Sequence, residues 1–353
     1  MNLAIVTPSY FPSVRGNSIT VQRIESGLRD QGVSVQVFSL DRQDRDTILT
    51  ALQHVRPDVI HGFHATATGP LAMAAARERD IPVVITLTGT DLNHDLFEAS
   101  LRSTVLTVLE GVKAIVVFHE AIRDKLLQEA PALRRKVHVI GQTVQCNEKP
   151  YDLRGALGFD LRDFIVFQPA GIRRVKNIPS VIPLVRMLHE RHPRLRYVLA
   201  GPIIEADEGS RILAMLQNLP WAYYPGALNH EEICAVLPTV QVVLNSSLSE
   251  GGMSNAVLEA MSKGVPVLAS DIEGNRTVIV DGHDGFLYRS DVDFIEKMER
   301  LILDSALRSS VGRRARQKIE TEFPLEGEVT SHLRLYQALA ATRGAKQRWI
   351  CMH

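Results

Sequence analysis

The sequence predicts an α/β protein of two domains, each with a parallel sheet covered by helices on both faces. Three observations lead to this prediction. The chain has 353 residues, more than a single ordinary core organises. Short apolar runs alternate with helical patterns, as βαβ units require. The alternation stops at residues 141–159 and then restarts, which indicates a linker between two similar halves.

The first half holds six apolar runs that we expect to form strands: Leu3–Val6, Val33–Phe38, Asp58–His61, Pro82–Leu87, Ala114–Phe118 and Val137–Ile140. Helical patterns lie between the earlier runs, at Ser18–Asp30, Thr47–His54 and Leu71–Arg77. The regular order of strand and helix favours a parallel sheet, because parallel strands need crossover connections.

The second half repeats this order. Strands are expected at Phe164–Phe167, Arg196–Ala200, Trp221–Tyr224, Val242–Leu244 and Pro266–Ala269. Helices are expected at Pro179–Glu190, Ser210–Leu216 and Glu231–Leu237, and a long amphipathic stretch covers Asp293–Gln337. We therefore place the first domain at residues 1–150, the second at 151–330, and a C-terminal helix and tail that returns to the first domain at 331–353.

The composition excludes several classes of protein. Forty basic and forty acidic residues cancel, which argues against nucleic acid or an anionic membrane as an obligate partner. No apolar run reaches the roughly 18 residues of a membrane span, so no integral membrane segment is expected. The three cysteines are far apart and lack a C-x-x-C pair, which predicts free thiols in a reducing compartment. The expected location is the cytoplasm, and the oligomeric state is left open.

Unusual residues gather in the loops that follow predicted strands. These loops are Arg15–Asn17, Thr88–Asp95, Gly171–Asn177 and Ser246–Asn255, which are rich in glycine, amide and charge. In parallel α/β sheets, ligands bind at the carboxyl ends of the strands. The sequence therefore predicts a site in a cleft between two domains that face each other.

The segment Ser249–Met261 carries the strongest signal for chemistry. It places Glu250 on a glycine-rich turn and Glu259 inside the helix that follows. Such a turn lets backbone amides approach an anion, and the start of a helix adds the positive end of a dipole. Carboxylates do not favour a phosphate, so the two glutamates are expected to face hydroxyl groups. A site for a diphosphate and a polyol together suits a nucleotide sugar.

The segment Gly171–Asn177 supplies cations in the same half. Arg173 and Lys176 lie between a predicted strand and a predicted helix. An arginine forks onto two phosphate oxygens and a lysine acts as a point charge, so the pair suits a diphosphate. A solvated basic turn is the alternative.

Through these residues, the second half of the chain resembles the retaining glycosyltransferases of family 4, which have the GT-B fold of two Rossmann-like domains. The resemblance rests on Gly171–Lys176, Ser247–Gly251, Leu258–Met261 and Gly264–Val267. Eight residues separate Glu250 from Glu259, and the family usually has one fewer. An extra glycine in the turn accounts for this difference.

The first half narrows the resemblance to two groups. Arg15–Thr20 and Leu87–Leu92 are similar to the glycosyltransferase 1 domain-containing proteins and to the bacterial selenosugar synthases. Relatives often have a histidine where Thr88 stands here. The resemblance therefore leaves Asp91 as the candidate acid/base or acceptor-positioning group, with a helix N-cap as the alternative.

The resemblance also implies the donor-binding residues. Gly16 and Asn17 would lie beside the donor phosphates, and Arg173 and Lys176 would hold the diphosphate. Glu259 would bind the ribose. Glu250, which with Asp91 is a candidate catalytic residue, would bind a sugar hydroxyl. The turn and the helix start would contact the sugar through Gly252, Met253, Ser254 and Asn255.

The resemblance implies a retaining, metal-independent glycosyltransferase of the hexosyl or N-acetylhexosaminyl type. Its donor would be a nucleotide sugar, UDP-linked as is usual in the family, and its acceptor a small molecule. No cofactor is expected besides the nucleotide-sugar substrate. No metal is expected either, because Asp291–Asp293 precedes an amphipathic helix and suits helix capping better than metal binding. Three alternatives stay open: glycosylation of sulfur or selenium as in selenosugar synthases, a nucleotide-sugar epimerase, and an inactive nucleotide-sugar-binding protein.

Overall fold

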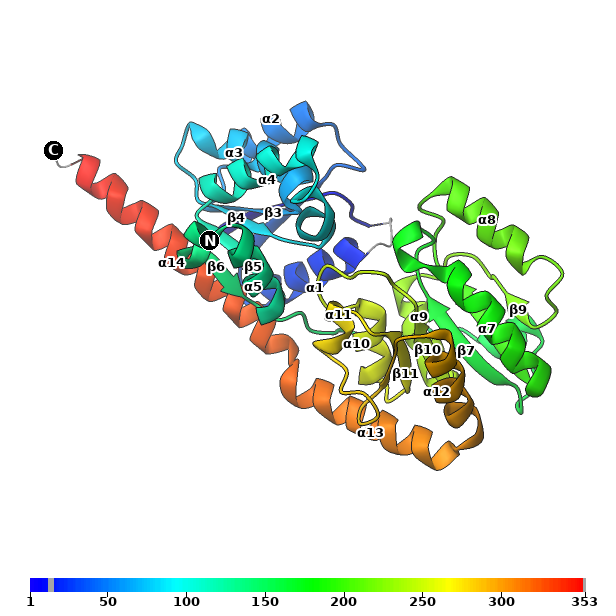
Figure 1. Cartoon of the computed structure of the whole chain (residues 1–353). Helices are drawn as coiled ribbons and strands as arrows, with labels where there is room; N and C mark the ends of the chain where they lie inside the picture. Colours follow the sequence, from blue (N-terminus) through cyan, green and yellow to red (C-terminus); the bar gives the residue numbers. More distant parts are fainter. Residues whose placement is uncertain (12–15, 352–353) are drawn as a thin grey trace. The chain divides into compact units, whose positions relative to one another are not determined.

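The computed structural model describes residues 1–11 and 16–351, with residues 344–351 as backbone alone. It divides into two compact units (Figure 1). Unit 1 comprises Met1–Gln142 and the chain from Leu325 onward, and unit 2 comprises Thr143–Pro324. The division falls at Gln142 where the sequence suggested residue 150, and the return to unit 1 begins at Leu325 where it suggested residue 331.

Unit 1 is built on a six-stranded parallel sheet. Its strands are β1 (Asn2–Thr7), β2 (Ser34–Ser39), β3 (Val59–Phe63), β4 (Val83–Thr86), β5 (Ala114–Val117) and β6 (Val137–Val139). They are ordered β2-β1-β3-β4-β5-β6, and every neighbouring pair is parallel. All six strands coincide with predicted apolar runs. Parallel strands are buried on both faces, which is why these runs are continuously apolar.

Helices cover both faces of this sheet. They are α1 (Gly16–Asp30), α2 (Arg45–Val55), α3 (Ala65–Arg77), α4 (Ala99–Gly111), α5 (Glu120–Glu129) and α14 (Leu325–Cys351). Alternate side chains of β1 point to opposite faces, so Leu3 and Ile5 pack in the core with α1 and α14. Ala4 and Val6 pack in the core with α2 to α5. In Figure 1 the red helix α14 runs along the sheet on the side opposite α3 and α4.

Buried polar contacts fasten α14 to unit 1. Arg23 of α1 donates two hydrogen bonds to Glu328, from Nε at 2.7 Å and from Nη2 at 3.0 Å. His61 of β3 lies between the hydroxyls of Tyr336 and Thr86, at 2.7 Å from each. Both histidine nitrogens are thus satisfied inside the core, which makes His61 a structural residue.

Unit 2 has a second six-stranded parallel sheet. Its strands are β7 (Phe164–Pro169), β8 (Leu195–Ala200), β9 (Ala222–Tyr223), β10 (Val242–Asn245), β11 (Val267–Ser270) and β12 (Phe286–Tyr288). The order is β12-β11-β10-β7-β8-β9. Numbered from the first strand of the unit, this is the 3-2-1-4-5-6 order of a Rossmann fold, and its direction of winding reverses between β7 and β10. Only β12 was absent from the sequence prediction.

The helices of unit 2 form two layers. They are α6 (Leu153–Leu157), α7 (Ile178–Arg191), α8 (Ala206–Leu216), α9 (His230–Val236), α10 (Asn255–Ser262), α11 (Glu273–Arg276), α12 (Asp291–Leu303) and α13 (Ser305–Glu322). Side chains of α9, α10 and α13 share one core with the sheet, and side chains of α7, α8 and α12 share the other. The amphipathic stretch predicted at Asp293–Gln337 is three helices, α12, α13 and the start of α14, and Ser290 provides the cap that begins α12.

The expectation of free cysteines was wrong for two of the three. Cys146 and Cys234 are joined by a disulfide, with their Cα atoms 5.5 Å apart and a sequence separation of 88. The segment after Gln142 packs on unit 2 instead of forming a loose linker, because Val144, Cys146 and Tyr151 contact its core. That packing brings Cys146 beside α9, a proximity that the spacing of the cysteines does not reveal.

Among the helices that the structure describes, none combines the length and the apolar composition needed to cross a membrane.

Candidate active site

The reversal point between β7 and β10 gathers the predicted donor-binding residues of unit 2. The chain after β7 forms a short 3₁₀ turn, η3 (Arg174–Lys176), and the chain after β10 forms the glycine-rich turn before α10. The two segments are tied together, because Ser246 Oγ donates to the carbonyl of Lys176 at 2.6 Å and Leu248 N donates to the carbonyl of Val175 at 2.8 Å. Ligands bind at such reversal points in open α/β sheets.

Lys176 and Glu250 form the central ion pair of this site. Lys176 Nζ lies 2.5 Å from Glu250 Oε1, and the two side chains are only 15% and 11% exposed. Ser247 Oγ donates to the same carboxylate at 2.7 Å, and Asn245 Nδ2 approaches it at 3.3 Å. The structure thus brings the predicted cation and the predicted first glutamate into direct contact.

The environment of Glu250 keeps its carboxylate ionised. Burial by itself raises the pKa of this group, but the charge of Lys176 and hydrogen bonds from Lys176, Ser247 and Asn245 outweigh it. The net result is a pKa below the ordinary value for glutamate. At neutral pH the group therefore only accepts hydrogen bonds, which suits a sugar hydroxyl.

Replacing Glu250 by glutamine is expected to remove an acid-sensitive part of the stability. Because the folded pKa is lowered, the carboxylate stabilises the fold above its unfolded pKa of about 4.3, and this contribution is lost as the pH falls through the folded value. Between about pH 5 and about pH 3, the wild type should lose more free energy of unfolding than E250Q. Urea titrations at several pH values measure this, and equal losses would contradict it.

Arg173 lies at the start of the η3 turn with an unused donor. Its Nε is buried and, among the described residues, has no hydrogen-bond partner. A buried donor without a partner is costly, and an anionic ligand would relieve that cost. This observation favours the diphosphate hypothesis over a solvated basic turn.

The turn that carries Glu250 is held by α11. A Cβ on Gly274 would lie 2.5 Å from the carbonyl oxygen of Gly252 and 2.8 Å from Cβ of Glu250, so the position requires glycine. Asn275 donates from Nδ2 to Asn245 Oδ1 at 3.3 Å. The residue that lengthens the turn is accommodated while Glu250 still contacts Lys176.

The start of α10 brings together the remaining predicted donor residues of unit 2. Gly252, Met253 and Ser254 are buried, Asn255 is the first helical residue, and Ser254 Oγ accepts from Asn245 Nδ2 at 3.1 Å. Glu259 lies in the same helix, is 4% exposed, and contacts His230 Nε2 through Oε1 at 2.8 Å. A helix start of this kind points amide groups and a positive dipole end at an anion.

The predicted residues of unit 1 lie at the strand ends of that unit. Gly16 and Asn17 begin α1, which follows β1 where the strand order of unit 1 reverses between β1 and β3. Arg15, the first residue of the predicted loop, lies outside the described residues.

The interpretation of Asp91 as an acid/base finds no support in its contacts. The side chain is fully buried, and its Oδ1 accepts amide hydrogens from Gly89 at 2.8 Å and Thr88 at 3.1 Å. Its Oδ2 accepts from Ala65, the first residue of α3, at 2.9 Å. Gly89 has φ of +125°, a conformation that favours glycine. Asp91 is not the N-cap residue of a helix either, because Thr90 holds that position for the turn Asp91–Asp95 and His64 holds it for α3. Its contacts give it a structural role, in which it shapes the loop and the start of α3.

Sequence reasoning missed five residues that support the site. They are His230, Asn245, Ser247, Gly274 and Asn275. Ser247 stood within a quoted motif without a role, and Asn245 directly follows the predicted strand Val242–Leu244. His230, Gly274 and Asn275 carry no signal in the sequence, because each acts on a residue that is distant along the chain.

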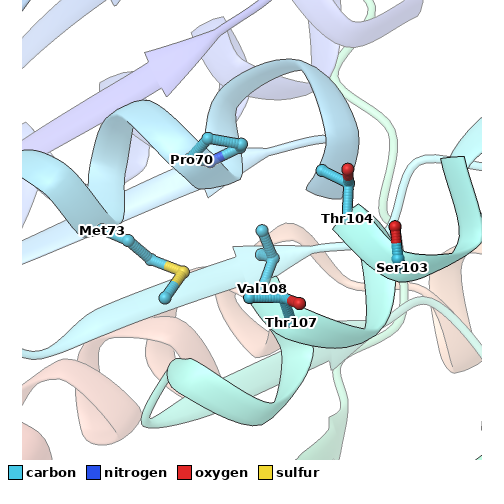
Figure 2. Close-up of a pocket in the computed structure, with 6 residues that line it drawn as sticks. All are labelled: Pro70, Met73, Ser103, Thr104, Thr107 and Val108. Carbon is cyan, nitrogen blue, oxygen red and sulfur yellow. The ribbon is translucent and has the colours of Figure 1, made fainter.

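A hollow of about 420 Å³ lies elsewhere, between α3 and α4 of unit 1 (Figure 2). It is lined by Pro70, Met73, Ser103, Thr104, Thr107 and Val108. None of the predicted site residues is among these six. Within the described chain, no group of three or more histidine, cysteine, aspartate or glutamate side chains is arranged to hold a metal ion.

Comparison with known families agrees with this geometry. The family model described as glycosyl transferases group 1 matches residues 152–318, and the model of glycosyltransferase family 4 matches residues 43–148. The chain is a glycosyltransferase, similar to family 4 in its first half and to group 1 in its second. These matches confirm the resemblance to family 4 glycosyltransferases that the sequence suggested. The GT-B fold class is confirmed by the solved structures described next.

This glycosyltransferase has relatives that match nearly all of it. Glycosyltransferase 1 domain-containing protein 1 of Xenopus tropicalis is 26% identical over 325 residues, which cover 89% of this chain and 91% of that protein. Among solved structures, Anabaena HepE in complex with UDP and glucose has a TM-score of 0.79 at 16% identity and covers 96% of this chain and 100% of its own. Sucrose-phosphate synthase of Thermosynechococcus elongatus also has a TM-score of 0.79, at 17% identity, covering 97% and 99%.

Proposed function

We propose that this glycosyltransferase moves a hexosyl or N-acetylhexosaminyl group from a UDP-sugar to a small acceptor, with retention of configuration and without a metal ion. The observation that carries the proposal is the presence of two cationic residues, Lys176 and Arg173, at the reversal point between β7 and β10 of unit 2. There Lys176 contacts Glu250, and the buried Nε of Arg173 has no partner among the described residues. UDP as the carrier is supported by Anabaena HepE, which was solved with UDP and glucose.

In this proposal the cations act on the leaving group. As the bond between sugar and diphosphate loosens, negative charge grows on the diphosphate. Arg173, Lys176 and the amide groups at the start of α10 stabilise that charge. These protein cations stabilise the charge that a bound metal ion stabilises in other transferases.

The glutamates bind the two polyol parts of the donor. Glu250, ionised and held by Lys176, accepts a hydrogen bond from a sugar hydroxyl. Glu259 accepts from the ribose, and Gly252, Met253 and Ser254 contact the sugar. By the same proposal, Gly16 and Asn17 bind the donor phosphates, and Asp91 has the structural role of shaping its loop through the amides of Thr88 and Gly89.

A panel of UDP-, GDP- and ADP-sugars tests the proposal. We expect release of nucleoside diphosphate from a UDP-sugar to depend on an acceptor and to persist in EDTA. The acceptor set should include hydroxy acids, inositol and selenophosphate, and the anomeric configuration of the product is measured by NMR. Failure to bind any of these donors would refute the proposal, and inhibition by EDTA would refute its metal-free part. Change of the donor sugar without an acceptor would indicate an epimerase, and binding without turnover an inactive binding protein.

A further inference from the structure

Glu259 has one anchored oxygen and one unused oxygen. Its Oε1 lies 2.8 Å from His230 Nε2. An ionised carboxylate only accepts, so the imidazole Nε2–H donates in this contact. Among the described residues, Glu259 Oε2 makes no hydrogen bond. The carboxylate is therefore fixed on one side and available on the other.

The His230 ring is itself held in place. Asn229 caps α9 by accepting from Glu232 N at 2.8 Å, and Glu232 Oε2 accepts from Asn229 N at 3.0 Å. This reciprocal capping box fixes the backbone on which His230 is the first helical residue. One turn further, Cys234 Sγ lies 3.7 Å from His230 Nε2, and its disulfide to Cys146 restrains the sulfur.

We propose that His230 is a positioning residue for the donor ribose. It holds the Glu259 carboxylate so that Oε2 and the remaining lone pairs accept from the 2′- and 3′-hydroxyls of the nucleotide. A carboxylate has about four acceptor positions, so one donated bond from His230 leaves enough for both hydroxyls. Without the ring, the carboxylate turns freely about its last side-chain bond and meets the diol less often. This inference rests on the proposed function of the site.

The test measures ribose recognition directly. Isothermal titration calorimetry gives the Kd of UDP and of 2′-deoxy-UDP for the wild type, H230A, H230Q and E259Q. For H230A we expect the Kd of UDP to rise about tenfold, the effect of losing one charge-assisted contact. The preference for UDP over 2′-deoxy-UDP should fall toward that of E259Q. H230Q should keep most of this preference, because its side-chain amide donates in the same direction.

Two controls separate positioning from folding. His283→Ala removes an exposed histidine of the same unit and should leave both Kd values unchanged. In the double variant H230A/E259Q the ribose preference should equal that of E259Q alone, because His230 acts through Glu259. Thermal melting verifies that each variant is folded.

The outcomes distinguish this inference from the function on which it rests. If H230A is folded and keeps the wild-type preference for UDP over 2′-deoxy-UDP, the positioning role is refuted. A loss of preference in H230Q as large as in H230A would refute it as well. If the wild type binds no nucleoside diphosphate, the proposed function fails first, and the inference fails with it.

Discussion

Replacing Lys176 by alanine is expected to lower kcat/KM for the sugar donor by about a hundredfold to a thousandfold, which corresponds to about 3–4 kcal/mol. Two losses combine in this variant. The donor diphosphate loses a cation, and Glu250 loses the ammonium group that lies 2.5 Å away. A buried carboxylate without its partner is unfavourable, so the carboxyl takes up a proton more readily and binds the sugar hydroxyl less well.

The comparison needs a variant that breaks a lysine–carboxylate pair away from the site. Lys297 serves this purpose, because its side chain is 16% exposed and it pairs with Asp281 at 2.9 Å. K297A should alter stability without altering donor kinetics. The double variant K176M/E250Q removes both charges. Relative to K176A, it should regain more of the stability than of the activity. Donor kinetics of K176A equal to those of K297A would contradict the role of Lys176.

Replacing Arg23 by methionine is expected to destabilise unit 1 by about 3–5 kcal/mol. The side chains of Arg23 and Glu328 are 3% and 0% exposed, so the variant leaves a charged carboxylate buried without its guanidinium partner. Because Glu328 belongs to α14, the loss should loosen that helix first. In hydrogen exchange measured by mass spectrometry, R23M should increase the exchange rate relative to the wild type more in peptides of α14 and α1 than in peptides of unit 2.

A surface pair provides the matched control. Arg316 and Glu320 lie 2.8 Å apart, but both side chains are about 60% exposed. R316M should therefore change stability by less than about 0.5 kcal/mol. The double variant R23M/E328L replaces the buried pair by apolar groups and should recover much of the loss. If R23M costs no more than R316M, the buried pair does not hold α14 in place.

Most strands could be predicted because each depends on its own residues. A strand buried on both faces needs a continuous apolar run, and runs such as Leu3–Val6 and Val242–Leu244 are visible in the sequence. The strand β12 escaped prediction because it has only three residues, Phe286–Tyr288, which is too short for a pattern. The break between α12 and α13 escaped because both helices are amphipathic and meet at Asp304, which ends one and caps the other.

In the candidate site, too, the residues with a local pattern could be predicted, and those that act across distant segments could not. Lys176, Glu250 and Glu259 were found because a glycine-rich turn and the start of a helix are local patterns. The partners that orient them come from other segments. His230 reaches Glu259 from 29 residues away, and Gly274 supports the turn of Glu250 through the absence of a side chain.

By itself, the sequence determined the α/β class, the two halves and the family, because periodicity and contiguous motifs belong to short stretches of chain. Only the tertiary structure decided that Asp91 accepts from the first amide of α3, that Cys146 and Cys234 pair, and that α14 docks on unit 1 through Glu328. Each of these depends on the distance between segments remote in sequence. Packing sets those distances, and no local pattern encodes them.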